Sequence, residues 1–391
     1  MRPILVAIPS KLLFFVALAG ALIVFVRELI LRRTNKAIPL SSTPLYFVGG
    51  AVVLYAKLGD WSFGHPWAPV PIYSYGVMLG TALVVGWFLV MKFAAEDQLD
   101  PQEAGTIYMW SAVWSIIGSR VLWFINALTD PTIQSSPSML DLFKIWQGGL
   151  VAYGGMIAGF LASWYGCHKR KIPLLKWADV SAPSVVLGTG ITRMGCFLFG
   201  CDYGRVTTLP WAVRFPGPNT SLLHGIVQGG PQGSPAWLHH VHDLGMPVAA
   251  DWSYRIHPTQ LYESLSSLLL FALMMFIRRH RKFSGQVFLG WVLGYGILRP
   301  LIEVFRDDDD RGVYRFPFTE QLKFSTSQYI GGISVVLGLG LLVWLLRRYR
   351  RDPESSRLWL TPTLATASGP KGGANANLGG DRPANKRRKR R

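Results

Sequence analysis

The sequence predicts an all-α integral membrane protein with a core of seven transmembrane helices and an insert between two of them. Three observations carry this prediction: apolar stretches of nearly membrane-spanning length, few charged residues, and basic loops on one side. Charged residues make up 16% of the 391-residue chain, against roughly 25% in a soluble domain. Lipid-facing helices cannot carry many charges. The composition therefore excludes an ordinary cytosolic globule, a disordered chain and a disulfide-stapled secreted module.

Seven apolar stretches follow residue 70, and each is close to the ~20 residues that span a bilayer as a helix. Several are on the short side, which predicts tilted helices. The stretches cover residues 72–93, 105–128, 149–166, 180–200, 260–277, 286–302 and 328–346.

Basic loops test this assignment. They follow the third, fifth and seventh stretches, as HKRKIPLLK (168–176), RRHRK (278–282) and RRYRR (347–351). Seven crossings place all three on one side, and the positive-inside rule makes that side cytoplasmic. The C-terminus is then cytoplasmic. The connections expected outside are 129–148, 202–257 and 303–327, of which 202–257 is long enough to form a periplasmic head.

Two segments flank the core of residues 71–351. Residues 1–70 contain an apolar run at 12–31 that predicts an extra transmembrane segment, and residues 38–56 must then cross back. Residues 352–391 are rich in Ser, Thr, Pro, Gly and Asn, which predicts a disordered tail. The chain has a net charge of +18, of which residues 347–391, with 13 Lys or Arg and 3 Asp or Glu, supply +10 and end in the run KRRKRR. Because the basic residues adjoin apolar segments, membrane lipids rather than nucleic acid are the expected partner.

Buried arginines are the first candidates for function, since polar residues inside a membrane are expensive. Arg193 lies in the glycine-rich run GTGITRMGCFLFGCDYGR (188–205), and a guanidinium suits a phosphodiester. Arg299, Glu303 and Arg306 share one helical face at i, i+4 and i+7. Two arginines for one glutamate predict surplus positive charge and an anionic ligand, and we expect this face to converge with Arg193. The alternative is a set of arginines satisfied by buried carboxylates.

Two other segments place polar groups at membrane boundaries. WQGGLVAYGG (146–155) holds Tyr153 beside a glycine pair, Gly154 and Gly155, and here the strong alternative is close helix packing. HPTQLYES (257–264) enters the fifth stretch, either as a functional set or as an interfacial belt with a helix cap. The polar side chains of this second segment are His257, Gln260, Tyr262 and Glu263.

Cysteines and acidic runs give weaker signals. Cys196 and Cys201 either form a disulfide or remain packing thiols, and their spacing is no metal signature. The acidic run at 307–310 and the histidines of HHVH (239–242) are more typical of solvated clusters. No metal site is expected.

Taken in order, these segments resemble bacterial prolipoprotein diacylglyceryl transferases from Pro71 to Arg351. One motif alone would be weak, but six in the same order are specific. The motifs are YSYG (73–76), GSR (118–120), WQGGLVAYGG (146–155), TRMGCFLFGCDYG (192–204), HPTQLYE (257–263) and GYGILRPLIEVFR (294–306).

The resemblance implies a reaction. The diacylglyceryl group of phosphatidylglycerol moves to the thiol of the lipobox cysteine in a prolipoprotein signal peptide, and glycerol 1-phosphate leaves. The product is a thioether. The resemblance also implies that no metal or organic cofactor takes part. It implies a location in the bacterial inner membrane, with the active site toward the outer leaflet.

The resemblance also assigns residues. Arg193 and Arg299 match the family's essential arginines, and Tyr295 is one of the polar residues around them. The catalytic residues expected are Arg193, Arg299, Tyr295, Glu303 and Tyr153. The substrate-binding residues expected are Arg193, Arg299, Arg306, Tyr75, Arg120, Gly154, Gly155, His257, Gln260 and Tyr262.

This chain departs from the family's pattern at four positions. Cys196 and Phe199 stand where the best-known signature has asparagines, and Cys201 where it has glutamate. Tyr153 stands where many members have histidine, so a histidine base cannot apply unchanged. If a base acts on the substrate thiol, Tyr153, Tyr295 and Glu303 are unranked candidates.

Two other functions stay open at the level of the sequence. A transporter or flippase of an anionic lipid or solute would use the same buried arginines without covalent chemistry. It would be favoured by inverted repeats, and the sequence contains none that is evident. A metal-dependent alcohol phosphatidyltransferase would need aspartates grouped within helices, whereas the acidic run here lies in a loop.

Overall fold

The computed structural model describes residues 4–9, 69–129, 138, 139, 142, 149–218, 221, 222, 227, 228, 233–307, 313–316 and 319–360. A helix covers each of the seven apolar stretches. These helices are α3 (Ser74–Glu96), α4 (Pro101–Thr129), α5 (Ala152–Lys169), α6 (Leu174–Phe199), α8 (Thr259–His280), α9 (Gln286–Glu303) and α10 (Thr326–Arg351). The extra segments expected at 12–31 and 38–56 lie outside the described residues, as does the tail beyond residue 360.

Five helices of the described chain are long and apolar enough to cross a membrane, namely α3, α4, α6, α8 and α10. Helices α5 and α9 have 18 residues each. Polar and small residues lower their hydropathy, such as Arg299 and Glu303 in α9. A helical membrane protein is therefore confirmed, whereas the count of seven crossings stays a prediction.

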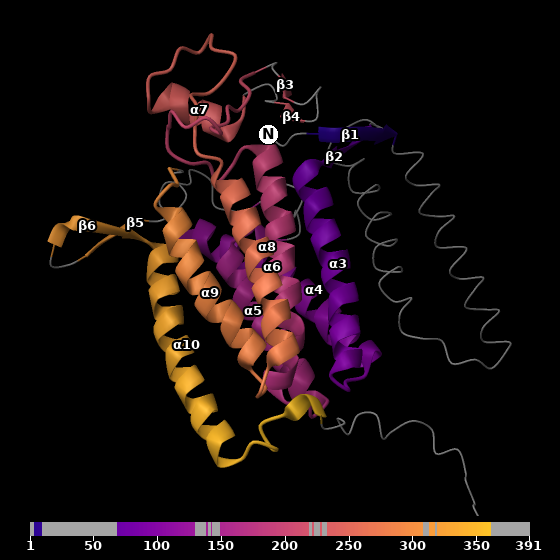
Figure 1. Cartoon of the computed structure of the whole chain (residues 1–391). Helices are drawn as coiled ribbons and strands as arrows, with labels where there is room; N and C mark the ends of the chain where they lie inside the picture. The colour runs from indigo at the N-terminus through magenta and orange to yellow at the C-terminus, as the bar shows by residue number, and fades with distance from the viewer. Residues whose placement is uncertain are drawn as a thin grey trace, which may run out of the picture.

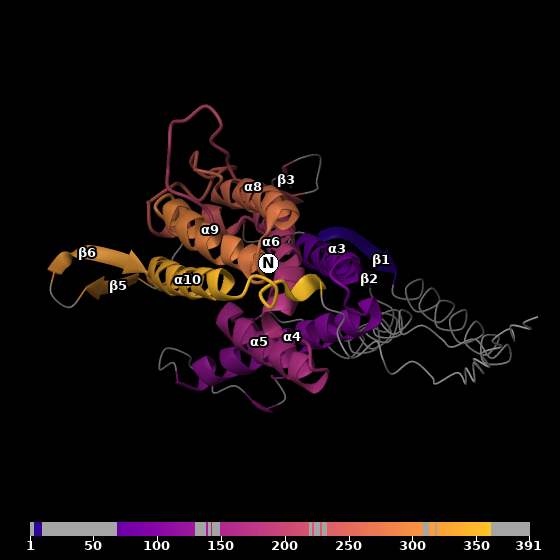
Figure 2. The same cartoon turned by 60° about the horizontal axis from the view of Figure 1, so that its bottom comes forward.

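Helix α6 lies at the centre of the bundle. It contacts α3, α5, α8 and α9, while α10 packs on the outer side of α9 (Figures 1 and 2). Small residues allow α4 and α5 to approach closely: a Cβ added at Gly154 would collide with the carbonyl oxygen of Gly118, and one at Gly155 with the hydroxyl of Ser119. Close packing through small residues is how helices associate in lipid, because apolar side chains gain little when they exchange contacts with lipid tails for contacts with another helix.

The described residues also form three two-stranded sheets. Strand β1 (Ile4–Pro9) pairs with β2 (Pro69–Tyr73), β3 (Ser221–Leu222) with β4 (Val227–Gln228), and β5 (Val313–Phe316) with β6 (Thr319–Ser325), all antiparallel. Helix α10 begins directly after β6. Its N-terminus carries a capping box, in which Ser325 and Gln328 each accept a backbone N–H of the other.

The basic loops of the sequence meet at one end of the bundle, which we call the basic end. Asp97, which follows α3, lies 2.6 Å from Arg278 and 2.6 Å from Arg281 at the end of α8. Asp179 of α6 accepts the backbone N–H groups of Gly285 and Phe288, at 2.7 and 2.9 Å, and so caps the start of α9. Two carboxylates therefore tie four helix ends together.

The chain folds back onto the basic end after α10. The backbone N–H of Ser284 donates to the carbonyl of Ser356 at 2.8 Å, and the guanidinium of Arg281 lies 4.4 Å from the ring of Trp359. A short 3₁₀ helix, Leu358–Leu360, ends the described chain. Residues 352–360 are thus an ordered extension of the bundle, although the sequence places them within a disordered tail.

The long connection after α6 forms a small folded unit at the opposite end, which we call the head (residues 202–257). It contains α7 (Pro235–His242), whose first turn is capped by Ser234. Tyr203, Phe215, Ala236 and Ile256 are buried together and form its core. Figure 1 shows the head at the end where α6 finishes and α8 begins.

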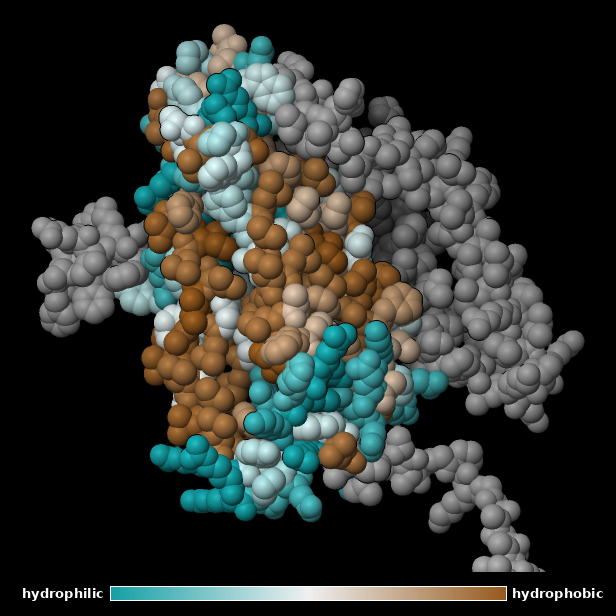
Figure 3. Space-filling model, in the orientation of Figure 1, coloured by the Kyte–Doolittle hydropathy of each residue, from teal (hydrophilic) through white to brown (hydrophobic). Residues whose placement is uncertain are grey.

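The surface of the bundle fits a lipid environment. Large apolar side chains such as Phe88, Leu269 and Leu337 are exposed on the helices. Figure 3 shows a broad hydrophobic band across the bundle, with hydrophilic residues gathered at the basic end and on the head. A soluble monomer does not expose so large an apolar surface.

Candidate active site

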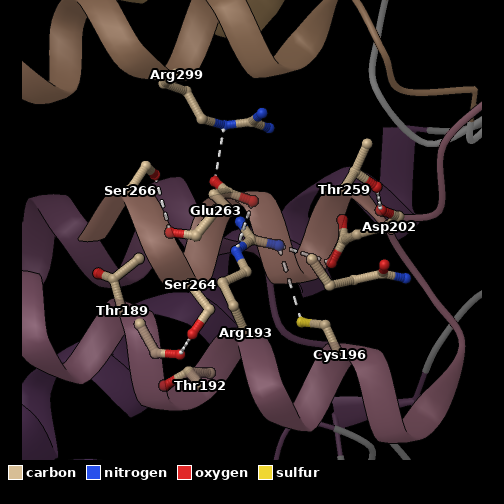
Figure 4. Close-up of polar contacts among 12 residues, drawn as sticks. Thr189, Thr192, Arg193, Cys196, Asp202, Thr259, Glu263, Ser264, Ser266 and Arg299 are labelled. Atoms are coloured by element: carbon tan, nitrogen blue, oxygen red, sulfur yellow. Dashed lines mark hydrogen bonds and ion pairs between the residues drawn. The ribbon is translucent and has the colours of Figure 1, made fainter. Parts of the chain in front are cut away.

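Arg193 and Arg299 converge on one carboxylate. Glu263 of α8 places Oε2 2.9 Å from Nε of Arg193 and Oε1 3.3 Å from Nε of Arg299 (Figure 4). The three residues come from α6, α8 and α9, and all lie in the half of the bundle next to the head. The convergence of the two arginines, expected from the sequence, is therefore present.

Three more residues extend this pairing into a closed circuit. Nη1 of Arg299 lies 2.6 Å from Oε2 of Glu303, and the same oxygen lies 3.8 Å from Nε of Arg306. Asp202 then connects Arg306 back to Arg193, through contacts of 2.6 and 2.8 Å. Three arginines and three acidic residues alternate around this circuit, which we call the ion-pair ring.

The ring corrects the charge balance expected from the sequence. Two arginines for one glutamate predicted surplus positive charge, because Glu303 was the only acid counted. Glu263 and Asp202 restore the balance. The structure thus combines both expectations for these arginines: they are gathered at one site, and each is also paired with buried carboxylates.

Several polar atoms of the ring lack a hydrogen bond of good geometry. Among the described residues these buried atoms are Oε1 of Glu263, Nη1 of Arg299 and both carboxylate oxygens of Glu303, and outside the ring Oε1 of Gln260 and the Ser74 hydroxyl. Burying ionised groups costs free energy unless every polar atom is satisfied. All of these ring atoms except Oε1 of Glu303 also belong to ion pairs of the ring, so the ring is a buried charged cluster with incomplete hydrogen bonding.

Asp202 is the most open acid of the ring. Its side chain is 24% exposed, against 3% for Glu263 and 1% for Glu303. Burial alone would raise the pKa of the Asp202 carboxyl, but Arg193 and Arg306 outweigh burial and hold this pKa at about 2. Asp202 is therefore ionised at neutral pH, and the ring is most exposed on its side.

Other predicted residues surround the ring. Tyr295 of α9 interacts electrostatically with Glu263, Arg299 and Arg193. The backbone and ring of Tyr75 lie against Gly195, two residues after Arg193. Gln260 donates from Nε2 to the carbonyl of Cys201 at 2.6 Å and so fixes the chain beside Asp202.

His257 and Tyr262 lie at the start of α8 and form a separate cluster with the head. The Tyr262 hydroxyl accepts from Nε1 of Trp211 at 2.8 Å and lies 3.2 Å from Nδ1 of His257. Both rings also contact Phe305, which follows α9. These residues connect the head to the helices that carry the ring, rather than lining the ring itself.

Arg120, Tyr153, Gly154 and Gly155 belong to the α4–α5 pair. Arg120 is buried, donates to the carbonyls of Leu142 and Gly149, and lies 4.0 Å from the ring of Trp123. The two glycines are buried against α4, as the packing alternative predicted, and Tyr153 is an exposed residue beside them. These four residues belong to α4 and α5, whereas the ion-pair ring is built on α6, α8 and α9.

Comparison with known proteins decides the family. The prolipoprotein diacylglyceryl transferase family matches residues 65–344. The chain belongs to the prolipoprotein diacylglyceryl transferase family. It is 30% identical over 298 residues to the phosphatidylglycerol–prolipoprotein diacylglyceryl transferase of Paraburkholderia xenovorans, an alignment covering 74% of this chain and 94% of that one. It is 31% identical to the enzyme of the same name from Geobacter sulfurreducens, over 70% of this chain and 91% of that one.

The resemblance found in the sequence is thereby confirmed, and the chain is a membrane transferase of the prolipoprotein diacylglyceryl transferase family. A third relative of the same name, from Clostridium tetani, is 28% identical over 72% of this chain and 95% of its own length.

Two members of the ring, Asp202 and Glu263, are absent from the predicted site residues. Glu263 was recognised only as a polar residue at the start of α8. One signal was available in the sequence: three arginines near the head need about as many carboxylates, and both acids lie at helix ends that face the head.

Proposed function

We propose that the chain transfers the diacylglyceryl group from phosphatidylglycerol to the lipobox cysteine thiol of prolipoproteins. Membership of the family and the printed names of its relatives support this substrate pair. The observation that carries the proposal is the ion-pair ring, which gathers Arg193, Arg299 and Arg306 at one end of an apolar bundle. Such a place gives an anionic headgroup its partners while the acyl chains stay in lipid.

The proposed reaction is a substitution at carbon. The sulfur of the lipobox cysteine, as thiolate, attacks the glyceryl carbon that carries the phosphate. The carbon–sulfur bond forms as the carbon–oxygen bond breaks, and the electron pair leaves with glycerol 1-phosphate. The phosphate changes from a diester to a monoester and gains negative charge. Arginines already in place for that charge stabilise the transition state without reorganisation.

The phosphate enters beside Asp202 in this proposal. Arg193 is the most exposed arginine of the ring, with 19% of its side chain accessible, and it is shared by Asp202 and Glu263. An arriving phosphate competes with the Asp202 carboxylate for Arg193 and Arg306. Arg299 lies deeper and stabilises the leaving group.

Ring residues are also the better candidates for a base. A free cysteine thiol has a pKa of about 8.5, and neighbouring arginines lower such a value. Oε2 of Glu303 is paired with Arg299, whereas its Oε1 has no hydrogen-bond partner, and Tyr295 lies within the electrostatic field of the ring. We therefore place Glu303 or Tyr295, rather than Tyr153, next to the reacting thiol.

We further propose that α5 and α9 also cross the membrane, giving seven crossings. The basic end is then cytoplasmic by the positive-inside rule, together with the C-terminus. The head and the ring face the outer leaflet of the bacterial inner membrane. This orientation is supported by Arg278, Arg281 and the arginines at the end of α10, which all lie at the basic end.

A reconstituted assay tests the proposal. Purified protein is mixed with phosphatidylglycerol and a lipobox peptide, and mass spectrometry follows the diacylglyceryl adduct on the cysteine and the release of glycerol phosphate. We expect an adduct with the wild type and with Arg205→Ala, an exposed arginine near the ring, but none with Arg193→Ala. Folded wild-type protein that yields no adduct, yet moves anionic lipid between leaflets, would establish the transporter alternative instead.

A further inference from the structure

The end of α6 brings two cysteines together. Gly200 ends the helix in the left-handed conformation, with a φ of 80°. Its N–H donates to the carbonyl of Phe197 at 3.2 Å, and the N–H of Cys201 donates to the carbonyl of Cys196 at 3.3 Å. These two bonds define a Schellman motif around Gly200. In this motif, the residue four positions before the glycine comes close to the residue directly after it. Here both of those residues are cysteines.

The two thiols are close enough to react. Cys196 and Cys201 are both free, and their sulfur atoms lie within 4.8 Å of each other and of a carboxylate oxygen of Asp202. To form a disulfide, the two sulfur atoms must approach from this separation to ~2.05 Å. Nη1 of Arg193 lies 3.8 Å from the Cys196 sulfur, so the pair is at the edge of the ion-pair ring.

A bound metal ion fits this pair less well than a disulfide does. The third ligand would be Asp202, but its Oδ2 is engaged by Arg193 and its Oδ1 by Arg306, at 2.8 and 2.6 Å. A cation bound there would be close to two guanidinium groups. A disulfide is neutral and leaves both ion pairs intact.

We propose that Cys196 and Cys201 are a redox-active pair that closes into an intramolecular disulfide beside the ion-pair ring. The two thiols lose two protons and two electrons, and a sulfur–sulfur bond forms. The oxidant is a disulfide of a small thiol or of a thiol–disulfide exchange protein, which is reduced to two thiols. The availability of this oxidant at the head rests on the outward orientation proposed above.

The disulfide has a chemical consequence for a thiol-alkylating enzyme. Two free thiols beside Arg193 would be alternative nucleophiles toward the glyceryl carbon. The oxidised pair has no thiol to alkylate. It also fixes the turn that carries Asp202, since Cys201 directly precedes this residue and Cys196 belongs to the last turn of α6.

Peptide mapping tests the pair directly. Trypsin cleavage after Arg193 and Arg205 releases residues 194–205, which contain both cysteines and no other, while Cys167 falls on a different peptide. Protein is denatured with an alkylating agent, without reductant, after exposure to oxidised glutathione in detergent. We expect peptide 194–205 to be two hydrogens lighter and unlabelled, and to take two labels after reduction. Cys167 should be labelled throughout.

Controls separate the possible failures. Cys167→Ser should leave the oxidised peptide unchanged, whereas the peptide of Cys201→Ser should never become two hydrogens lighter and should carry either one label or one glutathione on Cys196. Two labels on the wild-type peptide after exposure to oxidised glutathione would overturn the proposal. So would a pair protected from labelling in native protein until a chelator is added, with both hydrogens retained, because that result indicates a metal. Closure in detergent but not in cells would overturn the outward orientation and leave the reactivity of the pair established.

Discussion

Asp202 and Arg306 are 104 residues apart in the chain, yet their side chains form an ion pair of 2.6 Å. This contact joins the end of α6 to the end of α9 and closes the ion-pair ring. The Asp202 carboxylate also pairs with Arg193, whose other carboxylate partner is Glu263. In the proposed reaction, Asp202 competes with the arriving phosphate for Arg193 and Arg306, and the first prediction tests this competition.

Asp202→Asn should change phosphatidylglycerol binding and turnover in opposite directions. Asparagine keeps the shape of the side chain but removes the charge that competes with phosphate, so KM for phosphatidylglycerol should fall. Arg193 and Arg306 lose a charged partner worth about 1.5–3 kcal/mol, so their placement is weaker and kcat should fall roughly tenfold or more. Steady-state kinetics with the lipobox peptide measure both constants. Asp307→Asn, whose side chain lies 4.0 Å from the exposed Arg205, is the matched control, and equal kinetics for the two variants would contradict the role of Asp202.

Arg299→Lys should lose most activity although it keeps the positive charge. Arg299 uses Nε toward Glu263 and Nη1 toward Glu303, two atoms at fixed separation. A single ammonium group cannot reproduce this fork. We expect a loss of roughly 100-fold in kcat/KM, equivalent to about 2.7 kcal/mol. Arg205→Lys is the control for the same substitution at an exposed site. Wild-type activity in Arg299→Lys would show that only the charge matters.

Arg299→Ala should also lower stability, since removing one partner leaves buried carboxylates uncompensated, at a cost of about 3–5 kcal/mol. Thermal unfolding in detergent measures this loss separately from turnover. A stable but inactive variant would mean that Arg299 acts in catalysis alone.

Gly154→Ala should destabilise the fold through the α4–α5 contact. The added Cβ collides with the backbone of Gly118, and overpacking of this kind costs about 1–3 kcal/mol. Gly80→Ala in α3 is the matched control, because nothing lies within 4 Å of a Cβ there. Thermal unfolding in detergent compares the two. A normal melting temperature for Gly154→Ala together with a raised KM for phosphatidylglycerol would favour lipid binding at this glycine over packing.

The head should lose stability as the pH falls from about 6.5 toward 4. His240 is buried in α7, and its Nδ1 accepts the backbone N–H of Tyr254 at 3.0 Å. Burial, aided by the neighbouring His239, lowers the pKa of His240 to about 4. Because the unfolded state then binds more protons between these two pH values, stability is complete above about 6.5 and decreases below it.

Hydrogen exchange of residues 233–257 across this pH range measures the effect. His240→Asn keeps an acceptor for Tyr254 but does not titrate, so its exchange should depend less on pH than that of the wild type. His242→Asn, at an exposed position of α7, should behave as the wild type does. Equal pH profiles for all three proteins would contradict the assignment to His240.

The helices could be predicted from the sequence because their signal is local. Each apolar stretch contains its own reason to be a helix in lipid, and each basic loop marks its own end of the bundle. Arg193 and Arg299 could be chosen for the same reason, since a charge inside an apolar run is visible without a structure. The six ordered motifs then identified the family.

The partners of these arginines could not be predicted in the same way. Asp202 lies in the turn after α6, Glu263 in the first turns of α8 and Glu303 at the end of α9, and nothing local connects them. Arg120 has the same local signal as Arg193, a charge in an apolar helix, but its guanidinium satisfies backbone carbonyls beside α4. The same residue type therefore has different surroundings that only packing reveals.

The sequence by itself determined a helical membrane transferase, the end of the bundle where its basic residues gather, and the candidate arginines within its apolar helices. Only the tertiary structure decided that Asp202 and Glu263 close a balanced ring around Arg193, Arg299 and Arg306, and that the Gly154–Gly155 pair packs against α4. The physical reason is that hydrophobicity and charge act at every residue along the chain, whereas an ion pair or a close helix contact exists only when distant segments meet within a few ångströms.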